Sequence, residues 1–111
     1  MGGLVKLNTS GKLVRILMRI KVRYFASIRE LFGVSEEEYE VERGVKLADL
    51  LLNHIPDRHA HAADAWRDKV MQFMEGEEAS YIVIVNGDRA RLDQELKDGD
   101  VVAILPPVGG G

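Results

Sequence analysis

The 111-residue sequence predicts an α+β fold in which a mixed β-sheet packs on a helix. Three observations support this class. Residues 19–25 alternate charged and apolar side chains, which is typical of a strand. Residues 47–55 repeat leucine and isoleucine at helical spacing, and residues 81–85 and 101–105 are apolar on both faces, as central strands are. The length suits one domain with a single core.

The first half of the chain is predicted to form a strand, a short helix and a second strand. Residues 19–25 are the first strand. Ser27 and Glu30 have capping-box spacing and Gly33 stands where a helix would stop, so we expect one or two helical turns. The acid-rich residues 36–41 predict a second strand that pairs back on the first. We interpret its acids as a solvated edge and not a metal site, because no other side chain is expected to converge on them.

Two helices are expected in the middle of the chain. Gly44 turns the chain, and a helix follows until Pro56, which should end it. The apolar positions of this helix are Leu47, Leu50, Leu51 and Ile55. Residues 56–76 predict a second helix with an apolar stripe that we assign to the core. The stripe consists of Trp66, Val70, Phe73 and Met74.

The last part of the chain is predicted to be mainly strand. Residues 81–85 are followed at once by Asn86-Gly87, a dipeptide that favours a tight hairpin because both residues tolerate positive φ. Residues 89–91 are expected to form the short second strand of this hairpin. Asp98-Gly99 then turns the chain into the apolar strand 101–105. These elements complete the mixed sheet.

Met18 directly precedes the first strand, which suggests that residues 1–17 are an extension. Three origins are open: a longer native start, an appended non-native segment, or an added hairpin. In the hairpin, residues 4–7 and 13–17 would flank the turn Thr9-Ser10-Gly11.

Charge is unevenly distributed along the chain. The formal net charge is -3, yet residues 1–25 hold only basic charges, on Lys6, Lys12, Arg15, Arg19, Lys21 and Arg23. Because Lys21 and Arg23 alternate with apolar residues, they are interpreted as the wet face of a strand. The segment lacks the interleaved aromatic residues of a single-strand binder, so no nucleic acid partner is expected.

Several classes of site are excluded by residue content. The chain has no cysteine, which excludes disulfides and thiolate sites and favours a reducing, cytoplasmic location. His54, His59 and His61 should lie on different faces around a proline with no carboxylate partner, so no metal site is expected. No phosphate-binding loop, zinc-protease or serine-hydrolase motif occurs, and no apolar run is long enough to cross a membrane.

The C-terminal residues carry the chemistry. Pro106 and Pro107 lock φ and favour an extended chain, and residues 108–111 add a reach of roughly 13 to 14 Å. Glycine has no Cβ, so this tail can enter a narrow slot in another protein. A terminal carboxylate is a poor electrophile, and adenylation would convert it into an acyl group open to a sulfur or amine nucleophile. The chain itself supplies no catalytic side chain.

The sequence resembles the MoaD group of ubiquitin-like sulfur carriers, the small subunit of molybdopterin synthase. The resemblance rests on "RIKVRYFASIRELFG", on "VIVNGDRARLDQELKDGDVVAILPPV" and on the terminal Gly110-Gly111. It implies a β-grasp (ubiquitin-like) domain over residues 18–105, with a mixed sheet on one main helix and an extra helical insertion. An extended Gly-Gly tail follows over residues 106–111. Residues 1–17 lie outside the resemblance.

The resemblance also implies partners and a reaction. An E1-like adenylating enzyme would use ATP to activate Gly111, and sulfur transfer would leave a thiocarboxylate. Gly110 would give a slim approach, while Pro107, Val108 and Gly109 would line the channel of the large synthase subunit. There the sulfur would pass to the pyranopterin precursor of the molybdenum or tungsten cofactor. The chain itself would bind no cofactor.

The sequence departs from the family pattern at one position, and three alternative functions remain open. Gly109 makes the end a triple glycine, where many family members have a small residue with a side chain. The same tail suits a protein modifier that forms isopeptide bonds through Gly111. A thiazole-forming sulfur carrier is less favoured by the "LPPV" segment, and an interaction module with an inert tail is the third alternative.

Overall fold

The computed structural model describes residues 5–74 and 81–106. Its main sheet has five strands in the order β4-β3-β7-β5-β6, with β3 parallel to β7 and the other pairs antiparallel, which confirms the mixed sheet. The strands are β3 (Leu17–Tyr24), β4 (Glu36–Glu42), β5 (Ile82–Val85), β6 (Asp88–Arg89) and β7 (Val101–Leu105).

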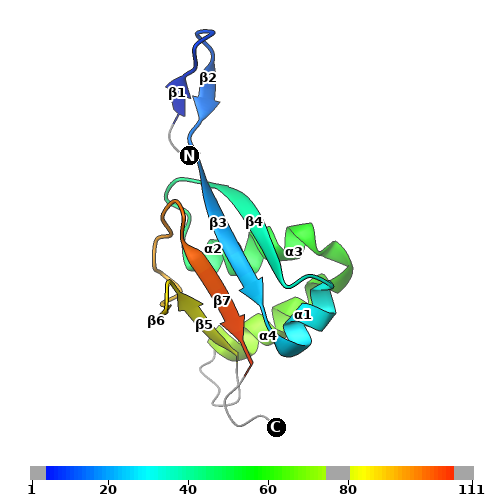
Figure 1. Ribbon diagram of the computed structural model, residues 1–111. Coiled ribbons are helices and arrows are strands. Elements are labelled where there is room, and N and C mark those ends of the chain that lie inside the picture. Colours follow the sequence, from blue (N-terminus) through cyan, green and yellow to red (C-terminus); the bar gives the residue numbers. More distant parts are fainter. Residues whose placement is uncertain (1–4, 75–80, 107–111) are drawn as a thin grey trace.

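The helices pack against one face of this sheet (Figure 1). They are α1 (Ala26–Phe32), α2 (Leu47–Asp49), the π-helical turn η1 (Leu50–His54), α3 (Ile55–Arg58), the 3₁₀ turn η2 (Ala60–Ala62) and α4 (Ala63–Met74). Leu50 and Ile55 share one buried hydrophobic core with Val22 and Ile104 of the sheet, and the Trp66 indole donates a 2.7 Å hydrogen bond to the Leu51 carbonyl. The α+β class, with a sheet packed on helices, is therefore confirmed. Over the described ranges, no helix is both long and apolar enough to cross a membrane.

The helix that begins at Leu47 does not end at Pro56, so that prediction was wrong. The chain passes through η1 and continues to Arg58. At the end of η1 the Ile55 N–H bonds the carbonyl of Leu50, five residues back. The wider π turn accommodates the proline ring, which would otherwise press on the carbonyl four residues before it.

The second helix begins later than predicted. Residues 56–58 still belong to the first helix, and α4 starts at Ala63 after the turn η2. Trp66 and Val70 of the predicted stripe are buried, Phe73 is partly buried, and Met74 is exposed. The helix is described to Met74, and Gly76 lies outside the described residues.

The capping box predicted at α1 was also wrong. The residue before the helix is Phe25, which makes no side-chain cap, and Ala26 enters the helix with φ 52°. Ser27 lies inside the first turn, where its hydroxyl is 2.6 Å from the Tyr81 hydroxyl. The helix does end at Gly33, which is left-handed with φ 76°, as predicted.

Residues 5–15 form a hairpin, which was one of the three alternatives for the N-terminal extension. Strands β1 (Val5–Leu7) and β2 (Leu13–Arg15) pair antiparallel. The hairpin extends beyond the N-terminal end of β3, away from the helices (Figure 1). Because β7 is parallel to β3, the hairpin and the C-terminal end of β7 lie at opposite ends of the sheet.

Candidate functional site at the end of strand β7

The predicted site residues lie outside the part of the chain that the structure describes. They are Pro107, Val108, Gly109, Gly110 and Gly111. What the structure shows is the segment from which they follow: strand β7, which ends at Leu105, and an exposed Pro106.

Strand β7 is held on both sides. Residues 101–104 pair in parallel with residues 21–24 of β3, and residues 102–105 pair antiparallel with residues 82–85 of β5. Its last residue, Leu105, still has Ile82 as a partner. The fold therefore fixes the position at which the C-terminal segment leaves the domain.

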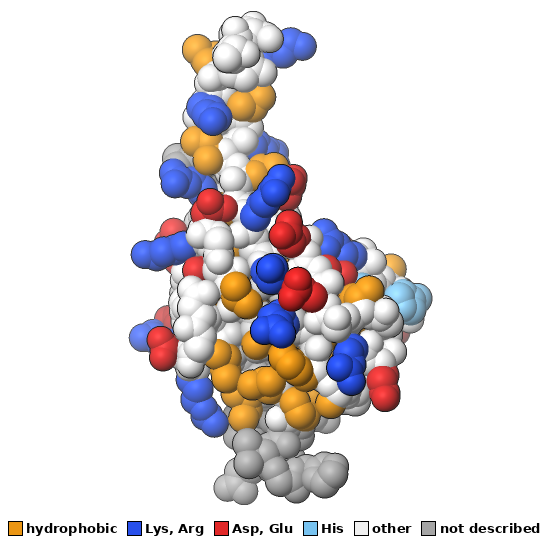
Figure 2. All heavy atoms as spheres, viewed as in Figure 1, with side chains coloured by type: hydrophobic (Ala, Val, Ile, Leu, Met, Phe, Trp, Pro, Cys, Tyr) orange, Lys and Arg blue, Asp and Glu red, His pale blue; other side chains and the backbone are white. Residues whose placement is uncertain are grey.

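The outer face of the sheet beside this exit is apolar. Alternate residues of β5 and β7 point into the core, among them Val83 and Ile104. The residues between them are only partly buried and form what we call the outer-face patch: Ile82, Ile84, Val101, Ala103 and Leu105. Figure 2 shows the hydrophobic side chains gathered on this part of the molecule. The helices pack on the opposite face, so they do not cover the patch.

Strand β3 borders the outer-face patch with basic side chains that pair with an acid of β4. By register, Lys21 lies beside Val101 and Arg23 beside Ala103. Glu36 of β4 is 3.6 Å from both the Lys21 ammonium and the Arg23 guanidinium, and these groups are half-exposed, which confirms the wet face predicted for the strand. An apolar centre beside a polar margin is the composition of a protein-docking surface.

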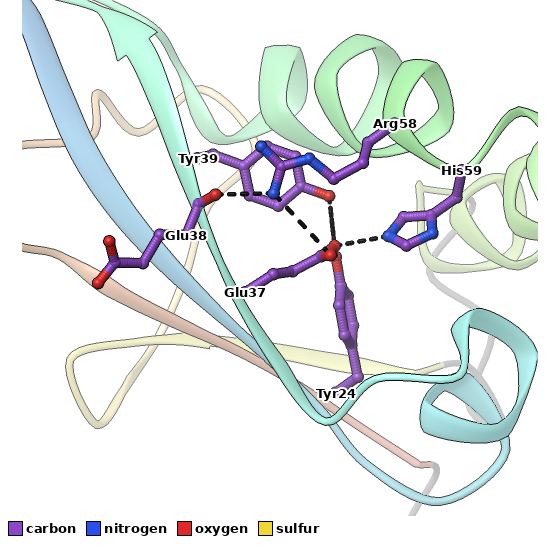
Figure 3. A network of polar contacts seen from close by, with 6 residues as sticks. All are labelled: Tyr24, Glu37, Glu38, Tyr39, Arg58 and His59. Atoms are coloured by element: carbon purple, nitrogen blue, oxygen red, sulfur yellow. Dashed lines mark hydrogen bonds and ion pairs between the residues drawn. The ribbon is translucent and has the colours of Figure 1, made fainter.

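A second cluster lies inside the molecule, where β4 faces the helices. Figure 3 shows three donors converging on one carboxylate oxygen, Oε2 of Glu37. The Tyr24 hydroxyl is 2.6 Å away, the Tyr39 hydroxyl 2.7 Å and His59 Nε2 2.6 Å. The Arg58 guanidinium lies over the Tyr39 ring at 3.8 Å and donates a 2.7 Å hydrogen bond to the Glu38 carbonyl. We call these residues the Glu37 cluster.

The electrostatics of the Glu37 cluster keep the carboxylate charged and the phenols neutral. Burial alone would raise the pKa of Glu37, but hydrogen bonds from Tyr24, Tyr39 and His59 outweigh it and hold that pKa below its ordinary value. Burial, together with the hydrogen bond to Glu37, raises the pKa of Tyr24 far above that of a free phenol, and burial also raises the pKa of Tyr39. Both tyrosines therefore remain donors at neutral pH.

Two sequence predictions fail at the Glu37 cluster. Other side chains do converge on an acid of residues 36–41, and His59 does have a carboxylate partner. Strict alternation along β4 was the missed signal, because Tyr39 and Val41 point inward and so must Glu37. No group of three or more His, Cys, Asp or Glu residues that could hold a metal occurs in the described ranges.

Comparison with known proteins identifies the family. The model of the ThiS family matches residues 22–111. A molybdopterin synthase sulfur carrier subunit of Chlamydomonas reinhardtii is 42% identical over 96 residues, covering 85% of this chain and 100% of that protein.

Two solved structures agree in fold and in sequence. A proposed molybdopterin converting factor subunit 1 from Pyrococcus furiosus is 36% identical with a TM-score of 0.61, over 82% of this chain and 99% of that one. Small archaeal modifier protein 1 from Methanosarcina acetivorans is 31% identical with a TM-score of 0.60, over 86% of this chain and 99% of that one. The β-grasp fold expected from the sequence is thereby confirmed, and the chain belongs to the ThiS family.

Proposed function

We propose that this protein is a sulfur carrier for molybdopterin synthesis, with the C-terminal carboxylate of Gly111 as the sulfur-bearing group. The observation that carries the proposal is the 42% identity to a molybdopterin synthase sulfur carrier subunit over the whole length of that protein, together with a family match that reaches residue 111. The fold supports it, because β7 is held on both sides up to Leu105 and is followed by an exposed Pro106, after which the tail begins.

The proposed reaction uses a separate E1-like enzyme that binds ATP. The Gly111 carboxylate attacks the α-phosphate and pyrophosphate leaves, giving an acyl adenylate. A sulfur nucleophile at the oxidation level of hydrosulfide then attacks the acyl carbon, the bond to AMP breaks, and a thiocarboxylate remains. The residues proposed to line the partner's channel are Pro107, Val108, Gly109 and Gly110. The two glycines have no Cβ, so the part of the tail next to Gly111 can enter a narrow channel.

The outer-face patch is the proposed docking surface for the partners. It adjoins the exit of the tail, so a partner seated on it would have the last residues within reach. The proposed partners are the adenylating enzyme and the large synthase subunit, which would use the tail in turn. In the large synthase subunit, the thiocarboxylate would deliver its sulfur to the pyranopterin precursor.

Intact-protein mass spectrometry on the chain isolated from its native cells tests the proposal. We expect a fraction heavier by the exchange of one oxygen for one sulfur, and no such fraction in a variant that lacks Gly110 and Gly111. The truncated chain should keep its thermal unfolding midpoint. Absence of the sulfur-bearing form under conditions of active cofactor synthesis would contradict the proposal.

The similarity to a small archaeal modifier protein favours one second function, which is protein modification. In that case a lysine amine would attack the activated Gly111 and form an isopeptide bond. Digestion of the proteins attached to the chain would then leave glycyl remnants on their lysines. The two functions use the same activated carboxyl and can coexist, so both products are measured in one experiment.

A further inference from the structure

One row of side chains crosses the outer face of the main sheet from edge to edge. Within each pair of neighbouring strands, two residues of the row lie directly opposite each other, so their side chains point to the same face. From β4 to β6 the row is Glu36, Arg23, Ala103, Ile84 and Arg89. Ala103 and Ile84 belong to the outer-face patch, so Arg23 and Arg89 border that patch from opposite sides.

The two arginines differ in what compensates their charge. The Arg23 guanidinium has a carboxylate oxygen of Glu36 at 3.6 Å, and the other cations of β3 also have acids of β4 within 3.6 to 3.9 Å. Arg89 is exposed, and its guanidinium forms no ion pair or hydrogen bond with any residue that the structure describes. Figure 2 shows basic side chains on both sides of the hydrophobic area. The β3 margin is thus neutralised within the chain, whereas the β6 margin keeps an unpaired positive charge.

The unpaired guanidinium sets a condition on any surface that covers the patch. In the isolated molecule water solvates this charge. A covering surface removes that water, and a charge that is then left without a partner is strongly unfavourable. A carboxylate on the covering surface compensates it, because it can accept two parallel hydrogen bonds from the planar guanidinium of Arg89. The β3 margin needs no such group, since Glu36 already lies beside Arg23.

We propose that Arg89 binds a carboxylate of the large synthase subunit and so selects and orients this partner on the outer-face patch. The partner surface would be apolar opposite Ala103 and Ile84 and acidic on the β6 side. A partner rotated by 180° would bring its acid next to Glu36 and leave Arg89 unpaired, so the charge pattern favours one orientation. This inference rests on the proposed function, because it takes the large subunit as the protein that covers the patch.

Calorimetry of the full chain with the large synthase subunit tests the inference. We expect Arg89→Gln to weaken binding about 30-fold and Arg89→Glu about 100-fold or more, because the carboxylate would lose its cation or face a second acid. Arg89→Lys should weaken binding only about fivefold, since an ammonium keeps the charge but not the paired hydrogen bonds. The loss in Arg89→Gln should shrink at high salt.

Arg67→Glu is the matched control, because it makes the same change in net charge away from the patch. Arg67 lies on α4, on the helical side of the sheet, and its side chain is 53% exposed. Its substitution should leave binding unchanged. Equal losses in Arg67→Glu and Arg89→Glu would overturn the inference, because net charge alone would then account for them.

Charge reversal on the large subunit identifies the carboxylate. One of its acids, changed to lysine, should weaken binding of the unaltered chain and restore binding of Arg89→Glu. A large subunit in which no such acid exists would overturn the inference. Each variant of the chain should keep the thermal unfolding midpoint of the unaltered protein, since Arg89 is an exposed residue of a short edge strand.

Ala103→Glu separates failure of this inference from failure of the proposed docking surface. If Ala103→Glu weakens binding but the Arg89 variants do not, the patch is covered and the inference about Arg89 is overturned. If the unaltered chain does not bind the large subunit, or binds it equally well after Ala103→Glu, the docking surface is wrong and the inference fails with it. The mass-spectrometric test of the sulfur-bearing form is independent of all these outcomes.

Discussion

The Glu37 cluster and the outer-face patch invert the usual distribution of side chains. In the cluster, a carboxylate, two phenols and an imidazole are packed between β4 and the helices, and one oxygen of Glu37 accepts three hydrogen bonds. In the patch, five apolar side chains of β5 and β7 remain partly in contact with water. One region is polar inside the protein and the other is apolar outside it.

The difference separates what the fold requires from what is left for a partner. The three donors that converge on Glu37 find their acceptor within the described chain, and no buried side-chain nitrogen or oxygen in that part lacks a hydrogen bond. The cluster is therefore complete in the isolated molecule. The patch gains free energy only when another surface covers it. Substitutions in the Glu37 cluster should therefore lower stability, whereas substitutions in the outer-face patch should weaken binding to a partner.

The largest effect is expected from Glu37→Ala. Removal of the carboxylate leaves His59 without its acceptor in a buried site and leaves Tyr24 and Tyr39 only the 3.1 Å hydrogen bond between their own hydroxyls, which should lower the free energy of unfolding by about 3 kcal/mol. Urea unfolding measures the loss. Glu40→Ala is the matched control on the same strand, because Glu40 is exposed and its ion pair with Arg19 is 3.9 Å long, so it should cost less than about 0.5 kcal/mol.

The difference in stability between the native protein and Glu37→Ala should depend on pH. The pKa of Glu37 is lowered on folding from an ordinary value of 4.5, so the stability it contributes is complete above pH 4.5. This contribution is lost as the pH falls through the lowered folded pKa. The stability gap between the native protein and Glu37→Ala should therefore narrow as the pH falls below 4.5. A gap that widens in acid would show that the carboxylate is not the stabilising form.

The substitution Ala103→Glu in the outer-face patch should weaken binding to a partner while changing stability little. Ala103 lies between Ile84 and Arg23 in the sheet, so the new carboxylate has a cation beside it and water above it, and stability should change by less than about 1 kcal/mol. If the proposed adenylating enzyme covers the patch, the new charge is desolvated on binding, and its affinity for this variant should fall about 30-fold or more. Calorimetry measures this affinity, and Met71→Glu on α4 is the control. Unchanged affinity would place the docking surface elsewhere.

Sequence patterns predicted the sheet well because each strand carries a local signal. The alternation of residues 19–25, the Asn86-Gly87 turn and the apolar runs 81–85 and 101–105 each depend on a few adjacent residues. Asn86 and Gly87 adopt φ of 52° and 89°, which is the conformation that their small side chains predicted. The family assignment, too, could be made from local motifs.

The errors arose where distant residues decide the outcome. Pro56 was expected to end a helix, but the π turn before it lets the helix continue, and nothing in the local sequence requires that turn. Ser27 was assigned to a cap, yet its hydroxyl contacts Tyr81, 54 residues away. His59 meets Glu37 only because the chain after α3 returns to β4. A local pattern holds no information about such contacts.

The smallest effect concerns Ala26, which stands between the two regions. The side chain of Tyr24, two residues earlier, belongs to the Glu37 cluster, while Phe25 lies beneath the Arg23 guanidinium at 5.6 Å on the outer side. At Ala26 the chain turns from strand to helix with φ 52°, a left-handed value that costs an alanine about 1 kcal/mol. Ala26→Gly should therefore stabilise the protein by about 0.5 to 1 kcal/mol, measured by thermal unfolding.

Ala48→Gly is the matched control for this substitution. Ala48 lies in α2 with helical geometry, where glycine should destabilise by about 1 kcal/mol. Opposite signs for the same chemical change would show that backbone conformation, and not loss of a methyl group, sets the result at Ala26. Because the strain lies at the junction, its relief should leave both the Glu37 cluster and binding at the outer-face patch unchanged. A stabilised Ala26→Gly variant that binds its partner more weakly would instead show that the strained turn shapes the docking surface.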